Sequence, residues 1–529
     1  MRDFHLPGRS TVYATGGMAA TSHPLSTLAA LDVLRRGGNA VDAAIAACAV
    51  QCVVEPQSTG IGGDCFALYA PPGGGVIGIN GSGWAPAAVT VERLRAAGLR
   101  DAIPATSPHA VTVPGAVAAW EALQKAYGRL DLGAVLEPAI RYARDGFPVL
   151  PRVGSDWERA QDRLRASEAA RAFYLPGDRP PAVGDVIRLP RLAHTLEAIA
   201  KGGAEAFYRG EPAAAMVETL CGFGGLHREE DFAEYAPEWV QPIHTTYRGV
   251  RVFECPPNGQ GFVALLMLNI LEGFDLAALD PHGADRFHLE AEATKLAFRD
   301  RDALLADPRH APVPVEELLS KGYAAKLRAL IDRERALRDL PPPLLRGVGN
   351  TVYVSVVDRD LGACSFINSL YDSFGSGLAC PKTGVLFHCR GRAFRLDSAH
   401  PNAIGPRRRP MHTIIPGLAF RDGELWACFG VMGADYQPVG HVHLLTNLVD
   451  FGMDPQEALD SPRVMAWPKE LLVERGVTPP VRAELARRGH EVVETEVPHG
   501  GGQCILIDRR RGVLVGGSDP RKDGVALGL

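Results

Sequence analysis

The segment Asn350-Thr351-Val352-Tyr353-Val354-Ser355-Val356-Val357-Asp358 decides how this chain folds and what it does. Its β-branched and aromatic residues predict a strand that begins at Thr351. A Pro/Gly-rich stretch, residues 340–349, precedes it and predicts an exposed loop. A threonine that opens a strand directly after such a loop is placed like a nucleophile that cleavage of the preceding bond sets free. The new α-amine, with a pKa of roughly 7.7–8.0, could then accept the proton of the Thr351 hydroxyl.

Composition indicates a soluble enzyme-sized protein rather than a nucleic-acid or membrane binder. The 529 residues are 46% hydrophobic and 22% charged, as is usual for globular proteins. A net charge of -5 provides no basic field for nucleic acid or anionic lipid, so we expect neither partner. The N-terminus has no apolar signal-peptide core, and the longest apolar-rich run, residues 40–54, is too short to span a bilayer. We therefore expect a cytoplasmic protein whose 10 cysteines, none in a C-x-x-C pair, are buried thiols.

Hydrophobic periodicity predicts helices with a few strands before Thr351 and mainly strands after it. Ser22 is expected to cap a helix that runs to Leu34, and Asn39 to open a second helix that Glu55-Pro56 ends. The other expected helices cover residues 284–305, 315–338 and 442–451. The expected strands cover residues 66–69, 76–79, 351–358, 363–369, 385–389, 414–420, 424–430, 504–507 and 513–516. Helices that flank two stacked sheets would satisfy this pattern.

Four other motifs invite a functional interpretation that their context does not favour. Gly73-x-Gly75-x-x-Gly78 matches a dinucleotide fingerprint, but strand-like residues follow it, so a hairpin turn is expected. His441-x-His443 places its two rings on different faces of a helix, so we expect no metal and no other cofactor. Gly375-Ser376-Gly377 lacks the strand–turn–helix frame of a serine hydrolase, and Cys65 has no local activating partner.

Several further motifs occur in a fixed order along the chain. They include Ser22-His23-Pro24-Leu25, Gly37-Gly38-Asn39-Ala40-Val41-Asp42, Gly60-Ile61-Gly62-Gly63, Asn350-Thr351, Phe374-Gly375-Ser376-Gly377 and Ser518-Asp519-Pro520-Arg521. With them the chain resembles the γ-glutamyltransferase family along nearly its whole length.

The resemblance implies an α+β fold, the αββα N-terminal-nucleophile sandwich of two stacked antiparallel sheets flanked by helices. It also implies self-cleavage between Asn350 and Thr351 into a large segment, residues 1–350, and a small segment, residues 351–529. The two segments would build one interleaved domain and stay associated as a heterodimer. In this family pattern Thr351 is the nucleophile and Ser369 is the hydroxyl residue beside it. Gly433 and Ala434 fall at the positions whose backbone N–H groups form the oxyanion hole.

The departures from the family pattern lie at the positions that bind a glutamyl substrate. Val91 stands where the family has the arginine for the α-carboxylate, and Ala393 where it has the aspartate for the α-amine. The other altered substrate-binding positions are Tyr371, Arg390 and the pair His412-Thr413. A zwitterionic head without either charged partner would bind poorly if buried, whereas Arg390 is suited to a carboxylate. For the nearby Arg392, binding of substrate and a solvated position are both open.

These replacements resemble the oxamate amidohydrolase-like branch of the family. The first hypothesis is therefore a self-cleaving amidohydrolase that acts on an amide of a small carboxylate-bearing substrate. The second is a γ-glutamyltransferase or glutathione hydrolase with a remodelled glutamyl site. The third is an uncleaved, inactive relative that serves as a binding protein. Whether the cleaved heterodimers pair further is left open.

Overall fold

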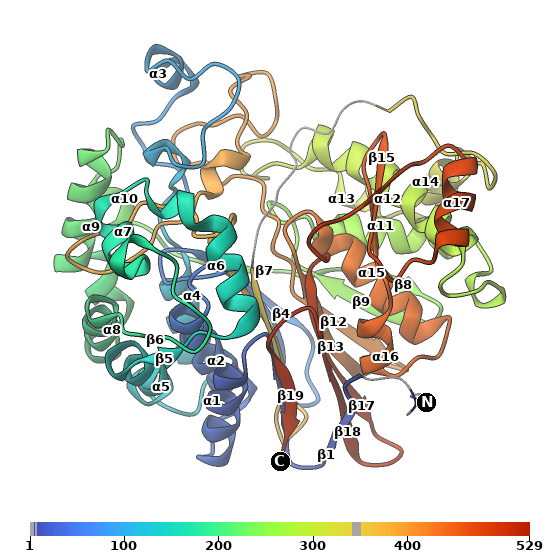
Figure 1. Ribbon diagram of the computed structural model, residues 1–529, viewed down its shortest axis with the longest axis horizontal. Helices are drawn as coiled ribbons and strands as arrows, with labels where there is room; N and C mark the ends of the chain where they lie inside the picture. Colours follow the sequence, from blue (N-terminus) through green and yellow to red (C-terminus); the bar gives the residue numbers. More distant parts are fainter. Residues whose placement is uncertain (1–4, 6–7, 341–350) are drawn as a thin grey trace.

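Two seven-stranded antiparallel sheets lie face to face at the centre of the computed structural model, with helices on both outer sides (Figure 1). The structure describes residues 5, 8–340 and 351–529. The predicted cleavage residue Asn350 and the predicted loop from residue 341 onward therefore lie outside the described residues. The layers confirm the α+β fold expected from the sequence.

The two large sheets each contain strands from both sides of Thr351. The first sheet has the order β1 (Val12–Ala14), β18 (Val513–Ser518), β17 (Gly501–Asp508), β13 (Glu424–Met432), β12 (Gly417–Arg421), β9 (Val250–Glu254) and β8 (Ile243–Tyr247). The second has the order β19 (Val525–Gly528), β2 (Met18–Thr21), β10 (Val352–Val357), β11 (Ala363–Ser369), β3 (Asp64–Ala70), β4 (Ile77–Gly81) and β7 (Glu238–Val240). The smaller sheets are β14 (Val464–Ala466), β15 (Glu470–Val473) and β16 (Glu491–Glu494), and the pair β5 (Phe147–Pro148) and β6 (Val186–Ile187).

The helices form two groups, one against each sheet (Figure 1). Those on the side of the second sheet are α1 (Pro24–Arg35), α2 (Ala40–Val54), α4 (Ala116–Tyr127), α5 (Leu132–Asp145), α6 (Pro151–Leu164), α7 (Glu168–Tyr174), α8 (Pro190–Tyr208), α9 (Glu211–Gly222) and α10 (Glu229–Ala233). Those on the other side are α11 (Gly261–Leu271), α12 (Ala284–Leu304), α13 (Val315–Leu318), α14 (Lys321–Arg328), α15 (Tyr436–Val449), α16 (Pro455–Asp460) and α17 (Pro479–Arg487). The short helix α3 (Val91–Ala96) lies apart, and the 3₁₀ turns are η1 (Pro108–Ala110), η2 (Pro176–Asp178), η3 (Leu276–Ala278) and η4 (Arg390–Ala393).

Helix α2 shows how small residues allow close packing on the sheet that carries Thr351. All of its residues are buried, and it packs against β10 and β11. Its many alanines let its backbone approach these strands closely. Asn39 caps it by accepting hydrogen bonds from the Val41 and Asp42 N–H groups, and Asp42 accepts from the Asn39 N–H in return. This capping box confirms the predicted start of the second helix.

Side chains from both sheets fill the layer between them. Tyr353 of β10 is buried there, and its hydroxyl lies 2.7 Å from Ser365 Oγ of the neighbouring strand. Gly430 of β13 faces the Tyr353 ring so closely that a Cβ atom at position 430 would overlap the ring carbons. The absence of a side chain at Gly430 therefore sets how near the two sheets can lie.

Several sequence predictions match the structure, and others needed the tertiary context. Strand β11 has the expected bounds, and β10, β13, β17, β18 and α12 differ from expectation only at their ends. The expected strand at residues 385–389 is wrong: only isolated bridges form there, because Phe387 pairs with Gly62, and Leu386 with Ala379. The expected helix at residues 315–338 is also wrong, since it divides into α13 and α14 and ends at Arg328.

Two helix starts were predicted wrongly. His23, not Ser22, caps α1, because Pro24 takes the first helical position and His23 Nδ1 accepts the Leu25 N–H. The Ser22 hydroxyl instead donates to Glu55 Oε2 at 2.6 Å. Helix α15 begins at Tyr436, one and a half turns before the expected start at residue 442.

The cysteines are all free thiols, nine of them buried and Cys221 exposed. Within the described residues, no helix is both long and apolar enough to cross a membrane. The cytoplasmic location stays a prediction, as does the division of the chain at Thr351.

The spacing of the sheets gives a test of the packing. Gly430→Ala should lower the free energy of unfolding by about 1–3 kcal/mol, the usual cost of overpacking a core, because the new methyl group meets the Tyr353 ring. Gly75→Ala is the control, since Gly75 lies in a loop and nothing is within 4 Å of a Cβ atom there. Chemical denaturation of both variants would measure the difference, and equal stabilities would contradict the packing argument.

Candidate functional site

Thr351 lies at the start of β10 and is buried against Ser369, the last residue of β11. The antiparallel register pairs Val352 with Asn368, so the residues at the two strand ends face one another. Thr351 Oγ1 and Ser369 Oγ are 3.1 Å apart, and either hydroxyl can donate to the other. The Tyr371 N–H donates to Ser369 Oγ at 2.9 Å, and the Ser369 hydroxyl is within donating distance of Thr351 Oγ1. Such a donor favours negative charge on Thr351 Oγ1.

Gly433 and Ala434 form the turn between β13 and α15. Their φ angles are +121° and +50°, so both lie in the left-handed region. A Cβ atom at Gly433 would come within 2.8 Å of Gly500 Cα, which explains a glycine there. Ala434 adopts the left-handed conformation despite its methyl group. The turn lies at the N-terminus of α15, where the helix dipole favours negative charge.

Gln260 connects this turn to the substrate-binding candidates. Its Nε2 donates to the Ala434 carbonyl at 3.1 Å and to the Thr413 carbonyl at 2.8 Å. Arg301 Nη1 donates to Gln260 Oε1 at 3.1 Å and is also paired with Asp435. Neither residue was among the predicted site residues: Arg301 lies in a stretch that resembles the family, but its contacts with Gln260 and Asp435 join distant segments.

Arg390 is fully buried in the turn η4. Its Nη1 donates to Thr413 Oγ1 at 2.8 Å, and its Cζ lies 4.2 Å from the centre of the Tyr371 ring. Its Nε and Nη2 groups have no hydrogen-bond partner among the described residues. These two donors can form the paired edge of the guanidinium, the geometry that binds a carboxylate by two hydrogen bonds. Asp64 Oδ2, 3.9 Å from Nε, is the one carboxylate oxygen within 4.0 Å in the described part of the chain.

Arg392 differs from Arg390, because its charge is already paired. Its Nη1 donates to Asp372 Oδ2 at 2.6 Å, and Arg163 approaches the same oxygen at 3.5 Å. About two thirds of the Arg392 side chain is covered, so neither a solvated position nor a free substrate cation describes it.

His412 and Thr413 lie together but use their polar atoms differently. Thr413 Oγ1 holds Arg390, as described above. His412 Nε2 lies 3.0 Å from Asp64 Oδ2, and its Nδ1 accepts the Ile414 N–H at 3.4 Å. Burial, helped by the charge of Arg390, lowers the pKa of His412 to about 3. The neutral ring is therefore engaged within the protein at both nitrogens, and its contact with a substrate stays a prediction.

Asp64 and His388 belong to this cluster and were not among the predicted site residues. Asp64 begins β3 opposite Ser369 and has no solvent exposure. Its Oδ1 accepts the Gly83 N–H at 3.0 Å, and its Oδ2 lies 3.3 Å from His388 Nδ1. Burial raises the pKa of Asp64, but the His388 and His412 rings lower it well below the ordinary value. An acidic residue directly after Gly62-Gly63, at the start of a buried strand, was the available sequence signal.

The two positions that lack the expected charges are both buried. Val91 is the first residue of α3, and Ala393 ends the turn η4 that begins with Arg390.

A cavity of about 620 Å³ borders the Gly433 turn, within the range usual for ligand sites. It lies between α6 and residues of the small sheet and also contacts Ser373. Tyr436 and His499 stack at its wall with ring centres 5.1 Å apart.

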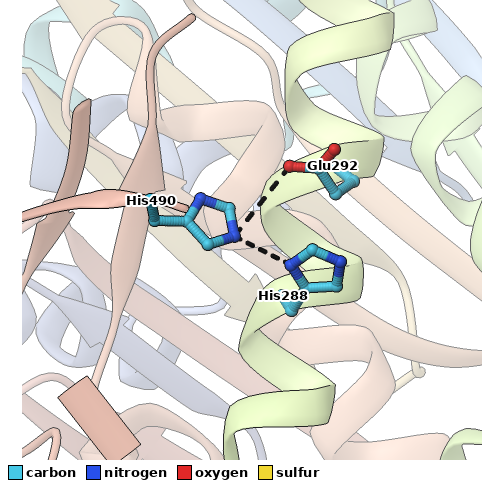
Figure 2. A group of neighbouring side chains, drawn as sticks. All are labelled: His288, Glu292 and His490. Atoms are coloured by element: carbon cyan, nitrogen blue, oxygen red, sulfur yellow. Dashed lines mark hydrogen bonds and ion pairs between the residues drawn. The ribbon is translucent and has the colours of Figure 1, made fainter. Parts of the chain in front are cut away.

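Three buried residues could offer ligand atoms to a metal ion: His288, Glu292 and His490 (Figure 2). His288 Nδ1 and His490 Nε2 are 2.8 Å apart. Glu292 Oε1, 4.0 Å from His490 Nε2, already accepts a hydrogen bond from Lys295 Nζ at 2.7 Å. A cation there would lie beside this buried ammonium, so the group fits a charge-paired hydrogen-bond network better than a metal site. His441 and His443 face different carboxylates, Glu254 and Glu290 respectively.

The family model described as Gamma-glutamyltranspeptidase matches residues 26–529. The chain belongs to the gamma-glutamyltranspeptidase family. It is thus an enzyme of the N-terminal-nucleophile hydrolase type, as expected from its motifs.

Relatives with different named activities match over their full lengths. The glutathione hydrolase-like YwrD proenzyme of Bacillus subtilis (strain 168) is 37% identical over 530 residues, covering 98% of this chain and 99% of the relative. The oxamate amidohydrolase proenzyme of Klebsiella pneumoniae subsp. pneumoniae is 35% identical over 534 residues, again covering 98% and 99%. The crystal structure of a cephalosporin acylase from Bacillus halodurans superposes with a TM-score of 0.94 at 43% identity, covering 100% of this chain and 99% of that chain. The oxamate branch is therefore one of several that resemble the chain at similar identity.

The Thr351–Ser369 contact gives a test that separates function from stability. Ser369→Ala should slow turnover by roughly 10²–10³-fold, as loss of a positioned donor does elsewhere. Ser365→Ala is the matched control, because Ser365 is buried in the same strand but contacts Tyr353 instead. Rate measurements at matched folded concentrations would decide, and equal losses in the two variants would contradict a special role for Ser369.

Proposed function

We propose that the chain is a self-cleaving amidohydrolase that acts on an amide of a small, carboxylate-bearing, oxamate-like substrate. Thr351 is the nucleophile, and its freed α-amine is the general base. Ser369 donates to the nucleophile oxygen, the N–H groups of Gly433 and Ala434 hold the oxyanion, and Arg390 binds the substrate carboxylate. The active form is a heterodimer of residues 1–350 and 351–529.

Self-cleavage and turnover use the same hydroxyl. In the first, Thr351 Oγ1 attacks the Asn350 carbonyl carbon, the Asn350–Thr351 C–N bond breaks, and water hydrolyses the resulting ester. Asn350 then ends in a carboxylate, and Thr351 carries a free amine. In turnover, that amine takes the hydroxyl proton as Oγ1 attacks the substrate amide and returns it to the leaving nitrogen. Water then hydrolyses the acyl-enzyme ester and releases the acid.

The observation that carries the proposal is the free edge of Arg390. A buried cation with two unpartnered N–H groups is costly, because neither N–H group is hydrogen-bonded to protein or exposed to water. A substrate carboxylate at Nε and Nη2 would supply both. Tyr371 and Ser369 connect this guanidinium to Thr351 through three successive contacts, so the carboxylate candidate and the nucleophile candidate belong to one contiguous cluster.

The charges of the site disfavour a glutamyl substrate. Val91 and Ala393 offer no charge for a zwitterionic head, and the Asp372 carboxylate is already paired with Arg392 and Arg163. The alternative is a glutathione hydrolase, the activity that appears in the name of the YwrD relative.

The cavity beside Gly433 favours a second candidate, an acylase with a bulkier leaving group. Its aromatic wall, Tyr436 and His499, could stack on a flat ring, and ammonia released from oxamate would fill little of its volume. The similar cephalosporin acylase agrees with this candidate.

The masses of the polypeptide pieces show directly whether self-cleavage has occurred. Wild type should give two pieces that begin at residues 1 and 351, whereas Thr351→Ala should stay at full length because it lacks the attacking hydroxyl. Intact mass spectrometry under denaturing conditions measures both. Full-length wild type would contradict the proposal and favour the inactive binding homologue.

The role of Arg390 can be tested with a neighbouring arginine as control. Arg390→Gln should reduce kcat/KM for oxamate at least about 30-fold, since breaking a buried charged contact costs about 2–5 kcal/mol. Arg392→Gln should change it much less, because Arg392 is paired with Asp372. Assays with oxamate and γ-glutamyl-p-nitroanilide would measure this, and turnover of the glutamyl substrate alone would refute the carboxylate-amide proposal.

A further inference from the structure

Among the described residues, Asp64 is the one whose carboxylate lies within 4.0 Å of Arg390, and it accepts no hydrogen bond from the Arg390 donors. It is fully buried, and its oxygens are held by the Gly83 N–H and by His412 Nε2, both at 3.0 Å. At 3.9 Å, Asp64 Oδ2 is beyond hydrogen-bond distance from Arg390 Nε. Coulombic attraction still acts over this distance in a buried site.

The other charged and titratable groups around Arg390 do not provide this balance. Asp372 is shared between Arg392 and Arg163, and burial lowers the pKa of His412 so that its ring is neutral at neutral pH. Burial raises the pKa of the Tyr371 hydroxyl, so the ring under the guanidinium also stays uncharged. His388 lies 3.3 Å from Asp64 on the side of Thr112, whose carbonyl its Nε2 contacts at 2.9 Å.

We infer that Asp64 is a built-in counter-ion: it balances the charge of Arg390 in the empty site and leaves Nε and Nη2 free for a substrate carboxylate. This inference rests on the proposed carboxylate site at Arg390. Asp64 is thus a positioning and specificity residue that does not touch the substrate. With Asp64 ionised, the empty cluster is close to neutral, and an entering carboxylate shares Arg390 with an existing anion.

Because Asp64 and the ligand share Arg390, removing the Asp64 charge should change stability and carboxylate affinity in opposite directions. Removal of the Asp64 charge should destabilise the empty enzyme, because Arg390 loses the nearest anion among the described residues. It should also strengthen binding of a carboxylate, because the ligand then supplies the missing charge. A purely structural Asp64 would lower stability and leave carboxylate binding unchanged or weaker. Asn at position 64 can keep the bond from the Gly83 N–H, whereas its amide group can donate to His412 Nε2 only if the ring gives up the bond from the Ile414 N–H.

The test compares thermal unfolding with and without pyruvate, which has the shape and charge of oxamate but no amide to hydrolyse. Asp64→Asn should melt below wild type without ligand, and its dissociation constant for pyruvate should be at least fivefold lower than that of wild type. Asp42→Asn is the matched control, because Asp42 is buried and accepts backbone N–H groups but lies in the capping box of α2. It should melt lower and bind pyruvate like wild type.

If Asp64→Asn binds pyruvate with unchanged or weaker affinity, the counter-ion inference is overturned. Saturable pyruvate binding by wild type that is lost in Arg390→Gln upholds the carboxylate site in either case. No binding by wild type or by Asp64→Asn overturns both proposals. If Asp64→Asn does not fold, the double variant Asp64→Asn/Arg390→Gln should, because the uncompensated cation is gone, and failure of the double variant to fold overturns the counter-ion.

Discussion

The position of β10 in the middle of its sheet is the constraint on which the site depends. This strand pairs with β2 on one side and β11 on the other, while α2 covers one face and the other sheet covers the second face. The antiparallel register sets Thr351 beside Ser369, and a slip of one residue would turn every side chain of β10 to the opposite face. Thr351, the proposed nucleophile, is therefore fixed by the sheet itself rather than by a mobile loop.

A buried charge imposes the second constraint. Arg390 needs an anion, and the nearest carboxylate in the described part of the chain is Asp64 at the start of β3, 3.9 Å away. Thr413 accepts a hydrogen bond from Arg390. The Gln260 side chain in turn donates to the carbonyls of Thr413 and of Ala434, in the turn beside α15. The carboxylate-binding candidate and the oxyanion candidate are thus parts of one hydrogen-bonded unit, so a shift in one would be transmitted to the other.

The sequence predicted the features that depend on local pattern. Strand β11, the start of α2 and most of α12 follow from alternation, capping and helical periodicity, and the ordered motifs indicated the fold around Thr351. The strand prediction for residues 385–389 failed. These residues have a β-like composition, but they form single bridges to Gly62 and Ala379 rather than a ladder. The helix predicted over residues 329–338 is absent because their N–H groups bond outside the segment: the Ala336 N–H donates to the Arg488 carbonyl, and the Leu337 N–H donates to Glu292.

The site residues also divide into those that local sequence pattern could place and those that it could not. Thr351, Ser369 and the Gly433 turn could be placed from motifs, since each lies at a strand end or turn that local pattern reveals. The roles of Asp64, Gln260 and Arg301 could not, because each contacts residues more than 100 positions away in the chain. Asp372 pairs with Arg392 and leaves the Nε and Nη2 groups of Arg390 without a partner. No local sequence pattern shows which of the two arginines Asp372 will contact.

The topology also bears on what a cut before Thr351 would do. The ladders β1–β18, β2–β10, β2–β19, β3–β11 and β9–β12 each join a strand from residues 1–350 to one from residues 351–529. Breaking one peptide bond removes none of these hydrogen bonds and exposes none of the apolar surface between the sheets. The two pieces would separate only if both sheets came apart, at the cost of the whole core. Cleavage can therefore create the Thr351 amine at a site that stays as rigid as before, which is what a nucleophile that carries its own base requires.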